Sequence, residues 1–476
     1  MARRIFLILP ALLAACSGGG GDGPAEPRPT PTPTPSPSPS PTPSPTPPAD
    51  PLDQAIADAA AAIRADTCRP AGANCAWTDR AYSPAEFEMA PGSGEAILII
   101  DSLPRLPVRA IRFRKHIKGY FRLGAGGAMH AATTGWRIPA ALWNALDRFS
   151  GPAFVPSQRL APIGDAANQA YAGIAFDNSG HGSTVFSLIA DNSPGQPLVL
   201  MDAIDLPAIA AADYCDAAGG DAAQTRLVQA AQRAADAIVA LMRANDVRFV
   251  NYSAGHTFQT VRDSWQGRCG TPLPAEAVLR DRLAAYAPIY AALFGTPGVL
   301  AVQAASETSG LHDAPYDQRI PAYRNRVRTG YFTVLASGLD DSGRGGVAAP
   351  QGWPARADAD IFVNTGVLPE RPYAFNRTPL LQSDDFSTAL FPITAPHTSW
   401  VAPLALARMI HLRFSQFPGR PFDDALIADI LDAATPARCP GQWDDRCAFQ
   451  DPMLHGQTEA VRLGLRPREY TGIAAP

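Results

Sequence analysis

The stretch Ala96-Ile-Leu-Ile-Ile-Asp101-Ser102 decides the fold class of this 476-residue chain. Its first five residues form an unbroken apolar run, which is typical of a strand buried on both faces of a sheet, and the run ends at a carboxylate. Four further apolar runs of this kind follow, at residues 197–201, 247–250, 298–302 and 331–335. The sequence therefore predicts several buried strands, the first of which ends at Asp101.

Segments with helical periodicity separate these runs. Between residues 222 and 244, apolar side chains recur at spacings of three and four, which marks one face of a helix. Further helices are predicted at residues 53–65, 274–294 (interrupted at Pro288), 399–414 and 423–434. Strands that alternate with helices at this spacing predict an α/β domain with a mainly parallel sheet. In such sheets, reacting groups collect at the carboxyl ends of the strands, which is where Asp101 stands.

The first 50 residues have the composition of an export signal followed by a tether. Arg3 and Arg4 precede an apolar run that is too short to span a bilayer, and small residues then lead to Cys16. Residues 24–48 alternate proline with threonine or serine, so they cannot bury apolar surface and are expected to form an extended tether with a reach of about 80 Å.

The segment Leu13-Ala14-Ala15-Cys16 resembles a bacterial lipobox. The resemblance implies a signal peptide at 1–15, a lipid on Cys16, a tether over 16–50 and a folded body over 51–476. Ser17 favours the outer membrane, so we expect a lipid-anchored protein whose body lies in the periplasm or at the cell surface. The alternative is an ordinary signal peptide in which the cysteine is incidental.

The composition excludes some partners and suggests disulfides. The net charge is −4, so the basic cluster at 109–118 is interpreted as a solvated face or loop and no nucleic-acid partner is expected. No Cys-x-x-Cys or His-x-x-x-His pair indicates a metal site. Six cysteines allow 15 pairings. Near neighbours in an exported chain favour the pairs Cys68 with Cys75, Cys215 with Cys269, and Cys439 with Cys447.

Three segments contain the candidate catalytic residues. They are the strand that ends at Asp101, the segment Asp177-Asn-Ser-Gly-His181-Gly-Ser, and the segment Thr398-Ser399-Trp-Val-Ala-Pro403. Taken singly, each has a structural explanation: Asp101 and Ser399 could cap the elements that follow them, and His181 could be a loop histidine between glycines.

Together and in this order, the three segments resemble the subtilase family of serine peptidases. The histidine segment matches the family's Asp-x-x-Gly-His-Gly-Thr apart from Ser183, and Pro403 falls four residues after the serine, as in the family. Leu103 stands where the family usually has glycine. The resemblance covers about residues 95–435 and implies a subtilisin-like three-layer α/β/α domain. Pro403 is expected to be tolerated because first-turn amides of a helix have no intrahelical partner.

The resemblance implies an active serine endopeptidase. Ser399 would attack a peptide carbonyl, His181 would take its proton, and Asp101 would orient the imidazole. This mechanism requires no cofactor. Members of the family often bind structural calcium, but no compact calcium-binding loop is recognisable in this sequence. We expect a monomer that acts on peptide or protein substrates.

Two further segments resemble the family's substrate-binding strands. Residues 250–255 resemble the first of them, and residues 299–307 resemble the second. An extended substrate would lie between these segments and pair with their backbones as an added strand. The residues expected beside the substrate are Ser253, Ala254, Gly255, Ala304 and Ala305.

The sequence departs from the family at the oxyanion hole. Glu307 stands where the family has an asparagine donor, and an ionised carboxylate there would repel an oxyanion. A protonated Glu307, or Ser306 or Thr308, could donate instead. Losing one such donor lowers the rate by about a hundred- to a thousandfold. His397 and Trp400 also replace smaller residues beside the serine.

These departures keep a second hypothesis open, a catalytically impaired subtilase-fold pseudoprotease that binds a peptide or protein partner. A third hypothesis, an α/β-hydrolase esterase that uses Ser253, conflicts with the sequence. Its nucleophile elbow requires Gly-x-Ser-x-Gly, and Asn251 occupies the first position.

Overall fold

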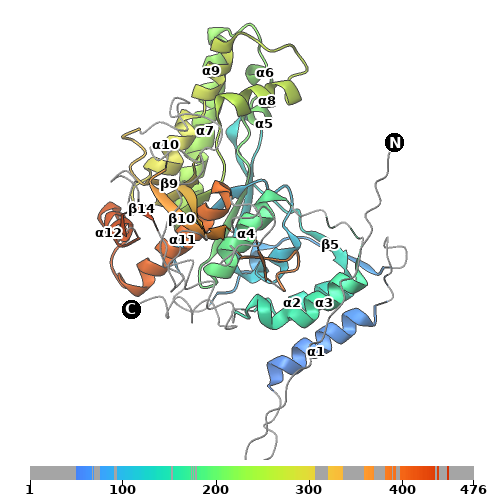
Figure 1. Cartoon of the computed structure of the whole chain (residues 1–476). Helices are drawn as coiled ribbons and strands as arrows, with labels where there is room; N and C mark the ends of the chain where they lie inside the picture. Colours follow the sequence, from blue (N-terminus) through green and yellow to red (C-terminus); the bar gives the residue numbers. More distant parts are fainter. Residues whose placement is uncertain are drawn as a thin grey trace, which may run out of the picture. The chain divides into compact units, whose positions relative to one another are not determined.

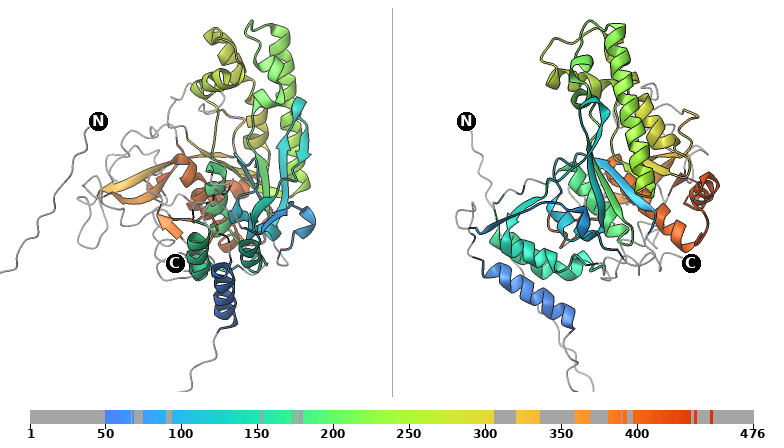
Figure 2. Two further views of the ribbon diagram at one scale, coloured as in Figure 1. Left: turned by 90° about the vertical axis from the view of Figure 1, so that its right-hand side faces the viewer. Right: turned by 180° about the vertical axis from the view of Figure 1, so that it is seen from behind.

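A mainly parallel sheet at the centre of the computed structural model positions the candidate site (Figures 1 and 2). The structure describes residues 50–66, 68, 75–89, 94–151, 154–172, 174, 176, 180–305, 320–335, 359–368, 381–388, 390–392, 397–434, 437–438 and 448–449. The strand order is β13-β14-β10-β9-β8-β7-β2-β6-β3-β4. From β10 to β3 all neighbouring strands pair in parallel, whereas β4 and β13 pair antiparallel at the edges.

The strands of this sheet are β2 (Ala96–Asp101), β3 (Ile117–Leu123), β4 (Met129–Ala131), β6 (Leu198–Asp202), β7 (Val247–Tyr252), β8 (Leu300–Ala304), β9 (Arg326–Leu335), β10 (Ile361–Leu368), β13 (Ala437–Arg438) and β14 (Ala448–Phe449). Two small antiparallel pairs lie outside it, β1 (Trp77–Arg80) with β5 (Trp136–Pro139) and β11 (Leu381–Ser383) with β12 (Leu390–Pro392).

The central strand β2 shows why the sheet is covered on both faces. All six of its residues are buried. Ile97 and Ile99 belong to one apolar core, and Leu98 and Ile100 belong to a second core on the opposite face. Side chains alternate across a strand, so an unbroken apolar run must bury both faces. The predicted three-layer α/β/α architecture is confirmed.

Helices form the two outer layers. The first core is covered by α1 (Pro51–Arg64), α2 (Ala140–Asp147), α3 (Ala161–Ala170), α4 (His181–Asn192), α11 (Thr398–Ser415) and α12 (Asp424–Ala434). The second core is covered by α5 (Leu206–Ile209), α6 (Ala211–Tyr214), α7 (Asp221–Ala244), α8 (Phe258–Arg268), α9 (Glu276–Ala284) and α10 (Ala287–Gly295). Figure 2 shows α7 and α4 on opposite faces of the sheet. None of the described helices is long and apolar enough to cross a bilayer.

Short 3-10 turns connect several of these elements. They are η1 (Pro84–Glu86), η2 (Val108–Ile111), η3 (Arg114–His116), η4 (Ala125–Gly127) and η5 (Ser157–Leu160).

The strands and helices predicted from the sequence are present in the structure, although several other elements, among them α2, α3, α4 and α8, were not predicted. The interruption expected at Pro288 separates α9 from α10, because Pro288 occupies the first turn of α10, where a missing N–H costs little. The strands β3 and β10 were not predicted from the sequence. Glycine and charged residues interrupt β3 (Ile-Lys-Gly-Tyr-Phe-Arg-Leu), so its apolar run is too short to recognise.

Disulfides join Cys68 to Cys75 and Cys215 to Cys269, which are two of the three expected pairs. Cys439 and Cys447 lie outside the described residues, as does Cys16. The longer loop, closed by the bond from Cys215 to Cys269, spans α7 and β7, so this bond fixes the end of α8 to the helical layer over the second core.

Candidate active site

Asp101 lies at the carboxyl end of the central strand. It is the last residue of β2 and is paired in register with Asp202 of β6. Its side chain is almost fully buried, and its Oδ1 accepts the N–H of Ser102 at 2.7 Å. Strand β2 therefore places the Asp101 carboxylate at the carboxyl edge of the sheet, and the hydrogen bond from Ser102 holds it in one orientation.

His181 is the first residue of α4, and its ring meets that carboxylate. The Nδ1 atom lies 2.8 Å from Oδ1 and 3.0 Å from Oδ2 of Asp101. An ionised carboxylate can only accept, so Nδ1 carries the hydrogen and Nε2 keeps the lone pair that a general base needs. Gly182 permits this approach, because a Cβ there would lie 2.4 Å from the Ser102 carbonyl oxygen.

Ser399 stands in the first turn of α11 and exchanges two hydrogen bonds with Ser253. The Ser399 hydroxyl donates to the Ser253 carbonyl oxygen at 3.1 Å, and the Ser253 hydroxyl donates to the Ser399 carbonyl oxygen at 3.0 Å. In the described structure, the Ser399 hydroxyl thus points to the end of β7 and not to the imidazole of His181.

The position of Pro403 explains the second of these bonds and corrects the sequence interpretation. Helix α11 begins at Thr398, so Pro403 is its sixth residue and not a first-turn residue. Its missing N–H would have bonded the carbonyl four residues earlier, which is that of Ser399. The buried Ser253 hydroxyl satisfies this carbonyl instead.

This compensation predicts how two substitutions combine. We expect Ser253→Ala to lower the free energy of unfolding by about 1–3 kcal/mol, because it leaves a partly buried carbonyl without a donor. In a Pro403→Ala background, residue 403 regains its N–H, so the cost of Ser253→Ala should fall to the part that comes from the lost acceptor of the Asn251 amide. Urea unfolding of the four proteins measures both costs, and equal costs in the two backgrounds would refute the explanation.

Trp400 brings the start of α11 against the imidazole. Its ring packs on the His181 ring with centroids 4.8 Å apart, tilted by 33°. The exposed His397 meets Trp400 edge-on at 6.2 Å. Of the two bulky residues singled out in the sequence, Trp400 therefore covers one face of the His181 ring, and His397 contacts Trp400.

The expected substrate-flanking segments lie next to each other. Strands β7 and β8 pair in parallel with Tyr252 opposite Gln303, so Ser253–Gly255 directly follow β7 beside Ala304, the last residue of β8, and Ala305. Ala254 is exposed and Ala305 is buried. The expected oxyanion residues Ser306, Glu307 and Thr308 lie outside the described residues.

A buried aromatic cluster holds the residue that follows Gly255. The His256 ring stacks on Tyr286 with centroids 3.7 Å apart, and its Nδ1 lies 2.8 Å from the Tyr290 hydroxyl. Burial lowers the pKa of His256 to about 3, against a weaker opposing hydrogen bond to the backbone of Ile204. His256 is therefore neutral at physiological pH and serves as an acceptor that fixes the end of this segment.

Two arginines of the basic cluster are buried, which corrects their interpretation as part of a solvated face. Arg109 is 6% exposed and Arg112 is 3% exposed. Burial lowers the pKa of Arg109, and it lowers that of Arg112 to about 10, while nearby carboxylates oppose both shifts. The cluster could not be recognised as buried from the sequence, because the partners of Arg109 in the chain segment before α11 lie about 275 residues away.

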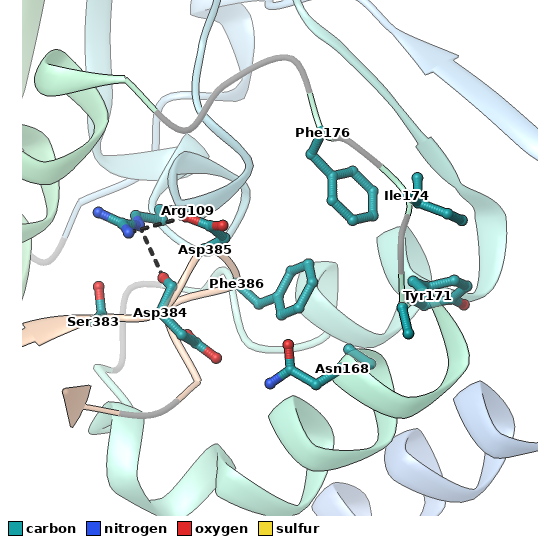
Figure 3. Close-up of a pocket in the computed structure, with 11 residues that line it drawn as sticks. Arg109, Asn168, Tyr171, Ile174, Phe176, Ser383, Asp384, Asp385 and Phe386 are labelled. Carbon is teal, nitrogen blue, oxygen red and sulfur yellow. Dashed lines mark hydrogen bonds and ion pairs between the residues drawn. The ribbon is translucent and has the colours of Figure 1, made fainter. Parts of the chain in front are cut away.

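An open pocket of about 410 Å³ lies beside Arg109 (Figure 3). Its walls come from the segment that leads to His181 and from the segment that follows β11. Its aromatic side chains are Tyr171, Phe176 and Phe386, and its polar ones include Asn168, Asp384 and Asp385. Within the described ranges, no three histidine, cysteine, aspartate or glutamate side chains are grouped so that they could bind a metal ion.

Comparisons with known proteins give only distant structural similarity. No family model matches the chain, and no curated protein does. The chain is similar to Pseudomonas sedolisin, a serine-carboxyl proteinase in complex with pseudo-iodotyrostatin, with a TM-score of 0.33 and 12% identity over 81% of this chain and 99% of that one. It is also similar to the epidermin leader peptide processing serine protease of Staphylococcus aureus, with a TM-score of 0.33 and 11% identity over 76% of each chain. A third similar structure is the PatG macrocyclase in complex with peptide, with a TM-score of 0.33 and 12% identity over 77% of this chain and 92% of that one.

Proposed function

We propose that the chain is a subtilisin-like serine endopeptidase in which Asp101, His181 and Ser399 form the triad. The observation that carries the proposal is the buried Asp101 carboxylate bonded to Nδ1 of His181 at the carboxyl end of the central parallel strand. The residue after Ser399 packs on the same imidazole, which supports placing the nucleophile beside its base.

Substrate binding would release the nucleophile. An extended peptide that pairs with residues 253–255 would donate a backbone N–H to the Ser253 carbonyl, the group that the Ser399 hydroxyl now occupies. Rotation about χ1 would then turn the Ser399 hydroxyl toward Nε2 of His181. His181 would take its proton as the oxygen attacks the peptide carbonyl, and Asp101 would stabilise the imidazolium.

The oxyanion would be stabilised first by the start of α11. The backbone N–H of Ser399 belongs to the first helical turn, where amides have no intrahelical partner and the helix dipole is positive. Glu307 in its protonated form, or Ser306 or Thr308, would supply a further donor. Ala304 and Ala305 would flank the other side of the substrate, next to β8.

The setting of this activity is part of the proposal. Cleavage before Cys16 and lipidation of that residue would anchor the body, through the tether over 16–50, to the bacterial cell envelope. The substrate would be a peptide or protein, without a cofactor.

Labelling of the purified full chain with a fluorophosphonate between pH 4 and 9 tests the proposal. The expected result is a covalent adduct mapped to Ser399, together with cleavage of unfolded casein, both lost in Ser399→Ala and retained in Ser253→Ala. An adduct on Ser253 would indicate the esterase instead. A folded chain with neither adduct nor cleavage would favour the pseudoprotease, in agreement with a Ser399 hydroxyl bonded away from His181 and with Trp400 over its ring.

A further inference from the structure

We propose that Arg109 is a positioning residue that fixes the turn at residues 384–388, before the Ser399 helix, against the His181 helix. This inference rests on the proposed peptidase function. Arg109 belongs to η2, and its guanidinium joins α4 to the segment that follows β11; Figure 3 shows its bonds to Asp384 and Asp385. Its Nε donates to the Asp384 carbonyl oxygen at 2.8 Å, and its Nη2 bonds Asp385 Oδ1 at 3.0 Å. Its Nη1 bonds the Ser187 hydroxyl at 3.3 Å and reaches that of Thr184 at 3.5 Å.

The partners on α4 belong to the first turns of the helix that His181 begins. Thr184 lies three residues and Ser187 six residues after His181. A displacement of these two residues along or around the helix axis therefore displaces the imidazole by a similar amount, because the helix moves as one hydrogen-bonded unit.

The partners on the other side form a closed turn between β11 and β12. Asp384 Oδ1 accepts the N–H of Thr388 at 2.6 Å, and its Oδ2 accepts the Thr388 hydroxyl at 2.7 Å. The Ser387 N–H donates to the Asp384 carbonyl at 3.0 Å. Helix α11 begins six residues after the end of β12, so this turn is an anchor close to Ser399 in the chain.

Arg112, the residue that directly follows η2, binds the same turn. Arg112 Nη1 bonds the Ser387 hydroxyl at 2.8 Å and also contacts the Ser387 carbonyl. Asp191, at the far end of α4, belongs to this network, and burial raises its pKa to about 6 although Arg112 and Arg109 oppose the shift.

The energetics favour a positioning role over a simple stabilising one. Burying a guanidinium costs several kcal/mol of desolvation, and apolar residues that replace a whole buried ion pair often stabilise a core at least as well. The apolar packing of α4 against α11 does not fix the two helices in one relative position, whereas planar, directional hydrogen bonds do. A misplacement of 1 Å between reacting groups lowers rates by about a hundredfold.

Arg109→Met, compared with Arg282→Met, tests the proposal in the full chain. Arg282 is a matched control, since it is fully buried and its Nε and Nη2 donate to the carbonyls of Tyr214 and Asp216 at 2.9 and 3.0 Å, on the opposite face of the sheet. We expect Arg109→Met to lower kcat and the fluorophosphonate labelling rate by about a hundredfold with KM unchanged. Arg282→Met should lower the melting temperature without changing labelling. Labelling of Arg109→Met at the wild-type rate would overturn the proposal.

Milder variants cover the case in which Arg109→Met does not fold. Asp385→Ala removes one partner whose side chain is 50% exposed, so folding should persist and kcat should fall in the same direction by less. Arg109→Lys keeps the charge but not the planar fork, and it should recover part of the lost rate. If Asp385→Ala and Arg109→Lys each had the kcat of the wild-type chain, the proposal would also be overturned.

Hydrogen exchange separates failure of this inference from failure of the proposed function. If the wild-type chain reacts with no probe, the peptidase proposal fails. The positioning role of Arg109 is then tested by the hydrogen-exchange rates of the backbone amides of residues 181–187 and 384–388. These amides should exchange faster in Arg109→Met than in Arg282→Met. Equal exchange in these peptides would overturn it.

Discussion

Replacing His181 by alanine is expected to lower kcat about 10⁶-fold on the peptide that the wild-type chain cleaves fastest in casein. Serine is a weak nucleophile unless a base within hydrogen-bond reach takes its proton, and His181 is the imidazole held by Asp101 at this edge of the sheet. Single-turnover hydrolysis with excess enzyme measures such slow rates. His397→Ala is the matched control, because His397 is exposed and its ring meets that of Trp400 edge-on, and it should retain most of the activity.

The double variant makes this prediction sharper. Residues of a triad act as one unit, so His181→Ala combined with Ser399→Ala should be about as slow as either single variant. If the two losses multiplied instead, Ser399 and His181 would act independently, and the triad assignment would be wrong.

Replacing Asp101 by asparagine is expected to lower kcat about 10⁴-fold while the fold is retained. Asparagine has nearly the shape of aspartate, but its amide can donate to Nδ1 and so favour the tautomer that carries hydrogen on Nε2. That tautomer cannot accept the proton of Ser399. Nuclear magnetic resonance of the histidine ring nitrogens would show the change of tautomer beside the kinetic loss.

Asp202 provides the matched control for Asp101. It ends the neighbouring strand β6 in register with Asp101, and its Oδ1 accepts the backbone N–H groups of Leu103 and Ala203 at 2.8 and 2.9 Å. Asparagine keeps an acceptor for these donors, so Asp202→Asn should change stability slightly and leave kcat unchanged. An equal loss in both variants would mean that Asp101 supports the strand end and not the chemistry.

The strand that ends at Asp101 was predictable because a local pattern determined it. An unbroken apolar run must be buried on both faces, and Ile97 and Leu98 indeed face different cores. The pairing of Asp101 with His181 was expected from the resemblance of their two segments to the subtilase family, and the structure places the two side chains in contact. The break at Pro288 followed from proline chemistry alone.

The interactions that hold the site together depended on contacts distant in sequence. Nothing near Pro403 indicates that Ser253, 150 residues earlier, supplies the donor that proline lacks. Nothing near Arg109 indicates that a turn about 275 residues later binds its guanidinium, so its charge suggested solvent exposure.

The sequence by itself thus determined the α/β/α layers and the position of Asp101 at the carboxyl end of a buried strand, because hydrophobic periodicity and strand direction are local properties of the chain. The tertiary structure alone decided that the Ser399 hydroxyl bonds the Ser253 carbonyl, that Trp400 covers His181, and that Arg109 is buried. The reason is physical: a hydrogen-bond partner is chosen by which polar groups packing brings within about 3 Å, and packing depends on the whole chain.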